Sequence, residues 1–214
     1  MAVDVFTQRN SMYGPLIVKA LEKRHFEAYY CPTKEEAVEK VMSLIPKGDL
    51  VGWGGSTTLK ELGILDRIYA EGYDLIDRRT AKTFEERQEI GRRCLLVDTY
   101  LSSSNAITED GQLLNIDGLG NRVAAITFGP KNVIIVAGIN KVVRDLDCAM
   151  ARIKTIAAPL NIQRFPDSTT TCRITGKCNE CITEDCSCSH VVTTRVCRPA
   201  KRIKVVLIGE PAGY

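Results

Sequence analysis

The chain has 214 residues, of which 44% are hydrophobic and 26% are charged, and its net charge is +3. This composition is typical of a globular protein with a buried core, and the small, dispersed charge gives no support for nucleic-acid or membrane binding. The first residues contain no apolar signal core and no segment approaches the roughly 18 apolar residues of a membrane span, so we expect a cytoplasmic protein.

Strand-like and helix-like segments alternate in the first hundred residues. Apolar residues at helical spacing predict helices over residues 11–24, 33–45, 58–72 and from 83 onward. Three of these helices begin with the capping-box spacing, at Thr33 with Glu36, at Thr58 with Glu61 and at Thr83 with Glu86. Short apolar runs predict strands at residues 26–31, 49–53, 73–77 and 94–103.

The pattern changes after residue 104. Two apolar runs within 105–118 are joined by Glu109-Asp110-Gly111, and Asp-Gly at a turn predicts a β-hairpin. A buried strand at 132–138, a helix from 142 that ends near Pro159 and a closing strand at 202–209 follow. The alternation predicts an α/β fold, with a mostly parallel sheet covered by helices and an antiparallel hairpin. We expect one domain over residues 1–214, with a Cys-rich insertion at 166–198 before the closing strand.

A loop of glycines and hydroxyl residues lies between a predicted strand and a predicted helix. Glycine lets a ligand approach backbone N–H groups, and a helix N-terminus adds partial positive charge. The candidates for binding a phosphate, a carboxylate or a coenzyme are therefore Gly54, Gly55, Ser56 and Thr57. The loop is neither a Walker loop nor a dinucleotide-binding motif, and a tight turn with hydroxyl caps explains it equally well.

The segment 105–122 is rich in polar residues although apolar strands flank it. Its candidates for binding a polar substrate are Asn105, Asn115, Asp117, Asn121 and Arg122. The guanidinium of Arg122 suits a carboxylate. Glu109 and Asp110 can act as acid, base or nucleophile where a neighbour perturbs them. Turn tips are usually solvated, however, so a plain hairpin turn is the simpler interpretation of these two residues.

Asn140 and Lys141 follow a buried strand directly. Ligands of open α/β sheets gather at the carboxyl ends of strands, where Lys141 can neutralise an anion. The simpler interpretation is a lysine at the start of a helix.

Six of the nine cysteines lie in the run CRITGKCNECITEDCSCSHVVTTRVC, from Cys172 to Cys197. A reducing cytosol disfavours structural disulfides. The C-x2-C pair is a compact chelate, and four thiolates can hold zinc or an iron–sulfur cluster. We favour a metal site over a disulfide or thiol switch, and both over inert thiols.

Three stretches together resemble the LUD-domain family of lactate-utilisation proteins. They are GGSTTLKELGI, SSSNAITEDGQLLNIDGLGNRVAAITFGP and VIIVAGINKVVRDLDCAMARIKTIAAPLN, within a resemblance that extends from about Tyr13 to Asn161. The resemblance implies a fold like that of the NagB/RpiA/CoA transferase superfamily. It also implies a cytoplasmic role in oxidising lactate or a related 2-hydroxy acid, alongside iron–sulfur partner subunits.

The resemblance also suggests roles for single residues. In related transferases a glutamate near a hairpin is the nucleophile, and Glu109 is its nearest analogue by position. Some short family members end in a segment of the form TGKC-x2-C before a closing strand, and this chain has TGKCNEC. The residues that fit that segment are Cys172, Cys178, Cys181 and Cys188, with Cys186 and Cys197 as additions.

Three functions are therefore compatible with the sequence. The first is a component of a lactate-oxidation system that binds an anionic metabolite, or coenzyme A or another phosphate-bearing ligand. The second is an acyl or CoA transferase-like enzyme with Glu109 as nucleophile. The third is a redox or interaction module that a metal stabilises and that has no catalytic activity.

Overall fold

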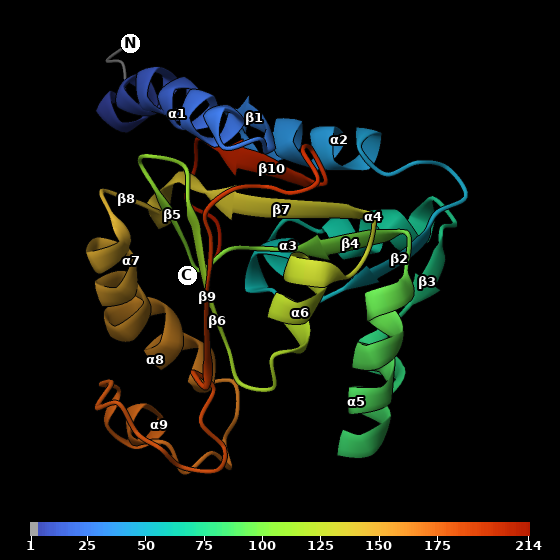
Figure 1. The fold of residues 1–214 in the computed structure, drawn as a ribbon, viewed down its shortest axis with the longest axis vertical. Coiled ribbons are helices and arrows are strands. Elements are labelled where there is room, and N and C mark those ends of the chain that lie inside the picture. Colours follow the sequence, from blue (N-terminus) through green and yellow to red (C-terminus); the bar gives the residue numbers. More distant parts are fainter. Residues whose placement is uncertain (1–3) are drawn as a thin grey trace.

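The computed structural model describes residues 4–214 and is built around a six-stranded parallel sheet (Figure 1). The strands lie in the order β1 (Glu27–Cys31), β10 (Ile203–Ile208), β7 (Asn132–Gly138), β4 (Thr99–Ser102), β2 (Leu50–Trp53) and β3 (Asp74–Ile76). All five neighbouring pairs are parallel. The α/β fold with a mostly parallel sheet, expected from the alternation of segments, is confirmed.

Both faces of this sheet are buried, because successive strand residues point to opposite sides. In β7, Val133, Ile135 and Ala137 pack on one side with α1 (Val5–Lys23) and α6 (Asn121–Phe128). Ile134 and Val136 pack on the other side with the helices α2 (Lys34–Ser43), α3 (Thr57–Glu61) and α4 (Ile64–Ala70). The sheet therefore forms the middle layer of the core.

A second sheet stands at the carboxyl end of the first. It has the order β8 (Val142–Val143), β5 (Ala106–Thr108), β6 (Leu113–Asp117) and β9 (His190–Thr194). β5 and β6 form the expected antiparallel hairpin, whose turn holds Gly111 at φ 87°. Ala106, Leu114 and Ile116 pack against α7 (Leu146–Arg152), the π-helical turn Ile153–Ala157 and α8 (Ala158–Ile162).

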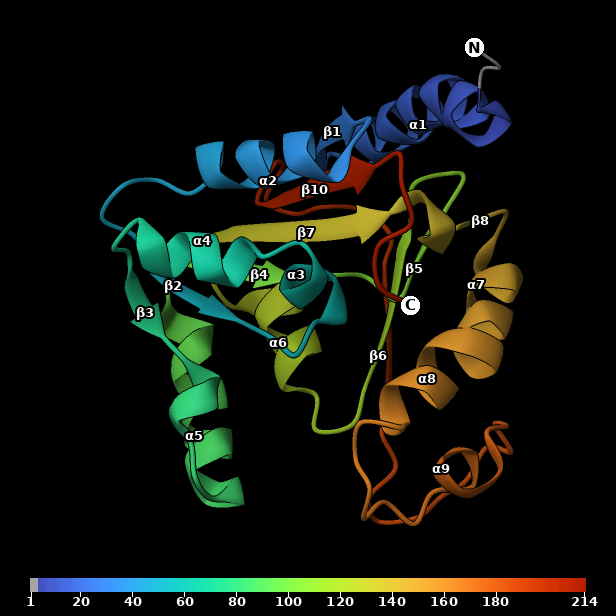
Figure 2. The ribbon, with the colours of Figure 1, turned by 180° about the vertical axis from the view of Figure 1, so that it is seen from behind.

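The remaining helices enclose the space beside this second sheet. They are α5 (Phe84–Arg93) and the short α9 (Thr171–Thr175) of the Cys-rich segment. Figures 1 and 2 show that α5 and the α8–α9 end both lie on the side of the molecule opposite α1. No helix between Asp4 and Tyr214 combines the length and the apolar composition that a membrane span requires.

The structure corrects four sequence-based expectations. The helix expected over 58–72 is two helices, because Gly63 adopts φ 65° between them, and Ser56 caps the first. The first half of the strand expected at 94–103 is a 3₁₀ turn, Cys94–Leu96. The helix expected from 142 begins at Leu146, because Val142 and Val143 form β8. α6 and β9 were not expected, and β9 joins the Cys-rich segment to β6.

Candidate functional site

A cavity of about 920 Å³ lies where the parallel strands end. Four of its wall residues follow four different strands: Gly55 after β2, Arg78 after β3, Ser103 after β4 and Lys141 after β7. α5, α8 and the Cys-rich segment complete the wall. The carboxyl edge of a parallel sheet is the usual ligand site of open α/β folds.

A second hollow of about 890 Å³ lies beside α2 and α4. Its wall is mostly exposed, and its charged residues Glu39 and Arg67 already form an ion pair of 3.0 Å. The cavity at the strand ends is therefore the better candidate.

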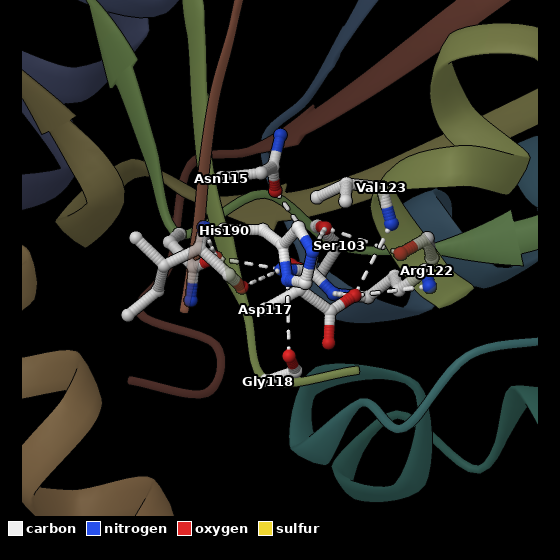
Figure 3. Close-up of polar contacts among 10 residues, drawn as sticks. Ser103, Asn115, Asp117, Gly118, Arg122, Val123 and His190 are labelled. Atoms are coloured by element: carbon white, nitrogen blue, oxygen red, sulfur yellow. Dashed lines mark hydrogen bonds and ion pairs between the residues drawn. The ribbon is translucent and has the colours of Figure 1, made fainter. Parts of the chain in front are cut away.

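Arg122 is the centre of the hydrogen-bond network behind this cavity (Figure 3). Nη1 donates to the Ser103 carbonyl (2.9 Å) and to Asn115 Oδ1 (2.7 Å). Nη2 donates to Asn105 Oδ1 (2.8 Å) and to the Ile116 carbonyl (2.6 Å). Burial lowers the pKa of Arg122, whereas Asp117 and Tyr100 oppose this shift. Four of its five N–H donors are thus used to fasten the hairpin to the end of β4.

Asp117 places the start of α6 against this network. Its Oδ2 accepts the backbone N–H groups of Arg122 (2.9 Å) and Val123 (3.2 Å), and lies 3.9 Å from Arg122 Nε (Figure 3). The N-cap position of α6 is Gly120, which has no side chain, so Asp117 takes over the capping role. Next to it, His190 of β9 lies 3.0 Å from the Gly118 carbonyl.

The two glycines of the 54–57 loop have different surroundings. A Cβ on Gly54 would lie 2.7 Å from the Tyr100 hydroxyl and 3.0 Å from Arg122 Cγ, so the packing beneath the loop admits only glycine. Gly55 is exposed, and its Cβ position lies 3.1 Å from Arg78 Nη1 and 3.9 Å from Arg164 Nη2. Two guanidinium groups therefore stand beside Gly55 in the cavity.

The hydroxyls of the same loop are largely engaged. Ser56 Oγ accepts the N–H of Leu59 at 3.2 Å and caps α3. Thr57 Oγ1 donates to the Tyr214 hydroxyl (3.0 Å) and accepts from Arg164 Nη1 (3.3 Å). The loop thus holds both Arg164 and Tyr214 at the cavity wall.

Lys141 is buried in the wall, with its residue surface 3% exposed. Its Nζ donates to Thr58 Oγ1 (2.9 Å) and to Ser103 Oγ (3.0 Å). Within residues 4–214 it forms no ion pair with a carboxylate. Burial, and then the charges of Arg152 and Arg122, lower the pKa of Lys141 to about 7, against a smaller opposing effect of Glu61.

Asn140, the neighbour of Lys141 in the sequence, has a structural role. Its Nδ2 donates to the Gly213 carbonyl (2.9 Å), and its Oδ1 accepts the N–H of Ala212 (3.1 Å). Glu61 Oε2 accepts the N–H of Gly213 at 2.8 Å. Together they fasten the segment that carries Tyr214 to the cavity.

The structure brings most of the predicted binding residues to one wall. Those that line the cavity are Gly55, Ser56, Thr57, Asn105, Asp117, Asn121, Arg122 and Lys141. Gly54 and Asn115 are buried and do not line the cavity, and Asn140 is exposed and lies outside its lining. Asn115 is 1% exposed, and because Oδ1 must face Arg122, its Nδ2 has no hydrogen-bond partner within residues 4–214.

Glu109, the nucleophile of the transferase alternative, does not line the cavity. The hairpin tip projects over α1, where Glu109 Oε1 accepts the Tyr13 hydroxyl at 2.6 Å. Burial and this contact raise the pKa of Tyr13 to about 12. Asp110 is also at the tip and pairs with Arg24, the C-cap residue of α1. The solvated-turn interpretation accounts for both carboxylates.

Sequence reasoning missed several residues of the wall. They are Thr58, Arg78, Arg87, Ser103, Arg164 and Tyr214. Arg78 and Ser103 each follow a strand closely, so the strand-end rule that singled out Lys141 applied to them as well. Arg87, Arg164 and Tyr214 reach the cavity only through tertiary packing, which leaves no local signal.

The thiols of the Cys-rich segment gather beside α9, with one exception. Burial raises the pKa of Cys188 to about 11; a hydrogen bond with Ser187 opposes this shift, and the nearby thiols of Cys186, Cys178 and Cys172 add to it to a smaller extent. The pKa of Cys181 is raised by burial but lowered overall by hydrogen bonds, first from the Thr171 backbone. All nine cysteines are free thiols.

Cys197 is the exception, since it is buried in the main core and accepts the N–H of Ile203 at 3.3 Å. Within residues 4–214 no three His, Cys, Asp or Glu side chains are arranged to hold one metal ion. The thiols are neighbours, but a shared metal would require their side chains to turn towards one another.

The arrangement of sheet, hairpin and strand-end cavity can be compared with known proteins. The family model described as the LUD domain matches residues 15–208. The chain belongs to the LUD domain family. The resemblance drawn from the three sequence stretches is thereby confirmed, and with it the association of the chain with a family linked to lactate utilisation.

Solved structures agree with this assignment at the level of the fold. A DUF162 family protein from Deinococcus radiodurans superposes with a TM-score of 0.52 at 10% identity, covering 93% of this LUD domain chain and 98% of that chain. Ribose 5-phosphate isomerase A from Methanocaldococcus jannaschii has a TM-score of 0.33 at 19% identity, covering 53% and 55%. eIF2B delta from Chaetomium thermophilum has a TM-score of 0.36 at 14% identity, covering 65% and 55%. The last two scores are too low to add to the argument. A comparison with curated protein sequences gives no match.

Proposed function

We propose that this LUD domain protein is a component of a lactate or related 2-hydroxy acid utilisation system, and that the strand-end cavity binds a small anionic metabolite. Membership of the family supports the pathway. The observation that carries the ligand class is the set of arginines in the cavity wall.

Three of these arginines are available to a ligand. Within residues 4–214, Arg78, Arg87 and Arg164 form no ion pair with a carboxylate, although all three line the cavity. The wall also holds four acidic residues. Asp117 is engaged by the start of α6, and Asp185 accepts the N–H of Thr169 (2.6 Å) and the hydroxyl of Ser168 (2.8 Å), whereas Asp167 and Glu184 form no ion pair within residues 4–214. A planar guanidinium matches a carboxylate or a phosphate with two parallel hydrogen bonds.

The size of the cavity widens the choice of ligand. A volume of about 920 Å³ lies near the upper end of typical small-molecule sites. It exceeds what lactate alone requires, so coenzyme A or another phosphate-bearing ligand also belongs to the proposal. The transferase alternative with Glu109 as nucleophile has less support, because the hairpin tip carries Glu109 away from the cavity.

The Cys-rich segment belongs to a separate part of the proposal. The neighbouring thiols support a metal site, zinc or an iron–sulfur cluster, that orders this segment. Cys178 and Cys181 would supply the C-x2-C pair, with further ligands among Cys172, Cys186 and Cys188. Its role would be structural, because Cys172, Cys178, Cys181 and Cys188 do not line the cavity that holds the arginines, although Cys186 does.

Ligand-induced thermal stabilisation tests the anion site. Purified protein is titrated with lactate, pyruvate and coenzyme A, and the same titration is made with Arg78→Gln and Arg87→Gln. Each change should weaken binding of the ligand by about tenfold or more, because a hydrogen bond to a charged group is worth roughly 1.5–3 kcal/mol.

Arg92→Gln is the matched control, because Arg92 lies on α5 like Arg87 but outside the cavity. Its exposed pair with Glu89 contributes little. Equal affinity in all four proteins, or no stabilisation by any of the three ligands, would contradict the proposal.

A further inference from the structure

The amino group of Lys141 has surroundings that a purely structural lysine rarely has. It is buried, it contacts two hydroxyls at 2.9 and 3.0 Å, and it has no carboxylate partner within residues 4–214. Thr58, Ser103 and Lys141 all line the cavity. Buried lysines without an anionic partner bear a large cost of desolvation in the charged form.

The positive charges around Lys141 disfavour its charged form, as burial does. Arg152 of α7 and Arg122 of α6 face Lys141 with positive charge, and Glu61 of α3 is the carboxylate whose charge opposes them. Both arginines are fixed: Arg152 donates to the Asn105 carbonyl (2.6 Å) and Arg122 to the Ser103 carbonyl (2.9 Å). Burial and these charges therefore favour the neutral amine, which makes up about half of Lys141 near pH 7, and one of the two hydroxyls can turn to donate to its single lone pair.

We infer that Lys141 is the reactive amine of the cavity and forms an imine with a carbonyl compound that carries an anionic group, such as a 2-oxo acid. The inference rests on the proposed anion site, and it names the substrate class of that site. The arginines hold the carboxylate or phosphate, and Lys141 meets the carbonyl carbon.

The chemistry balances without any redox partner. The Nζ lone pair attacks the carbonyl carbon while the C=O π electrons move to oxygen, which takes a proton and gives a carbinolamine. The nitrogen loses one proton as the carbinolamine forms. The carbinolamine hydroxyl then takes a second proton and leaves as water while the nitrogen lone pair forms the C=N bond, and loss of the remaining N–H proton gives the neutral imine. Ser103 and Thr58, each within 3.0 Å of Nζ, are placed to pass these protons.

This chemistry differs from simple neutralisation of an anion. A lysine that only attracts an anion works best when charged, and the free arginines of the wall already supply that charge. A neutral amine adds nothing to electrostatic attraction, but it is the form that attacks a carbonyl. The position of Lys141 among hydroxyls and arginines therefore fits a nucleophile better than a counter-ion.

Reductive trapping tests the inference on the intact protein. The protein is incubated near pH 7.5 with pyruvate, or with pyridoxal 5′-phosphate as a phosphate-bearing aldehyde, and borohydride is added to fix any imine as a secondary amine. Peptide mass spectrometry then locates the label. Label on Lys141 should exceed label on the exposed Lys131 or Lys177 by about tenfold, since exposed lysines lack the burial and the neighbouring arginines that favour the neutral, nucleophilic amine.

The two carbonyl compounds distinguish the sources of the anionic group. Labelling by pyruvate indicates a carboxylate ligand, and labelling by pyridoxal phosphate alone indicates a phosphate-bearing one. Lactate has no carbonyl carbon of this kind, so it should leave no adduct and should protect Lys141 from labelling by competition. Lys141→Arg should abolish the label at this position, and Ser103→Ala should slow its formation while keeping the amine.

Label spread evenly over exposed lysines, with none enriched at Lys141, overturns the inference. This result can be read from the wild-type protein alone, so it does not depend on whether the Lys141 variants fold. Arginine-dependent binding of pyruvate without an adduct would reject the imine and leave the proposed anion site standing. An adduct on Lys141 without arginine-dependent stabilisation would reject the anion site instead.

Discussion

Some arginines of the cavity hold the protein structure in place, and others are free to bind a ligand. Arg122 gives four N–H donors to protein oxygens, and its side chain is only 12% exposed, so it positions the hairpin and leaves little for a ligand. Arg78 lies in the same wall without an ion pair and is free to meet an anion. Two arginines within one cavity thus have different roles because only one has its donors filled.

The pKa of Lys141 predicts how stability depends on pH. The folded protein binds this proton with a pKa of about 7 and the unfolded chain with a value of 10.5, so between these values the unfolded state holds the extra proton. Stability from this group therefore rises with pH from about 7 upward. Compared with Lys141→Met, the wild type should gain roughly 1 kcal/mol of unfolding free energy per pH unit between pH 7.5 and 9.5.

Urea unfolding at several pH values measures this difference. Other groups titrate equally in both proteins, and Arg152, Arg122 and Glu61 remain in place around position 141. Parallel stability profiles for the two proteins would show that Lys141 stays charged in the folded state.

Among the elements, the Cys-rich segment depends least on hydrophobic packing. Its α9 has only five residues, and Ile174 and Ile182 are exposed. Before β9 pairs with β6, Cys172 is buried and Cys188 packs against the core, but both are small side chains. Fixing a residue costs roughly 1–2 kcal/mol of backbone entropy, which apolar burial here does little to offset. The free energy of binding a metal would offset this entropy cost and order the segment.

Changing Cys178→Ser and Cys181→Ser together tests this role. Protein purified without oxygen should contain metal in the wild type and lose it in the double variant, and the melting temperature should fall with it. Thiolates must be deprotonated to bind, so metal content should also fall at low pH.

Cys148→Ser is the matched control, because this partly exposed cysteine lies on α7 outside the segment. Metal content that survives the double change would exclude the site. Lost metal with an unchanged melting temperature would exclude the structural role.

At the scale of the whole molecule, the proposed function predicts partners. Family membership indicates a lactate-utilisation system, and iron–sulfur subunits are the partners we propose for it. A tagged protein recovered from cells grown on lactate should bring iron–sulfur proteins with it, identified by mass spectrometry and by visible absorption. Recovery of the protein alone, from cells in which those subunits are present, would contradict this part of the proposal.

The fold was largely predictable because its strands and helices carry clear local patterns. The hairpin around Gly111 and the strand 132–138 occur as expected, since turn chemistry and apolar runs are local properties. Local sequence patterns did not predict the secondary structure of segments whose conformation depends on tertiary packing. The apolar residues Cys94–Leu96 form a turn, and α6 follows a glycine that has no capping side chain.

The candidate site was predictable only in part for the same reason. Strand ends can be read from the sequence, and they lead to Gly55 and Lys141. The order of strands in the sheet cannot be read in this way, so neither the approach of Arg164 to Gly55 nor the displacement of Glu109 onto α1 had a local signal.

The place of β10 has a consequence for synthesis on the ribosome. β10 is the last strand in the chain, yet it lies between β1 and β7 and joins two parts of the sheet that do not pair with each other. While the chain is being made, β1 has no neighbour in the sheet, and the edges of β1 and β7 stay open until residue 208 has left the exit tunnel. Such long-range closure slows folding and leaves unpaired strand edges exposed in the meantime. The nascent protein should therefore depend on chaperones until its final strand inserts.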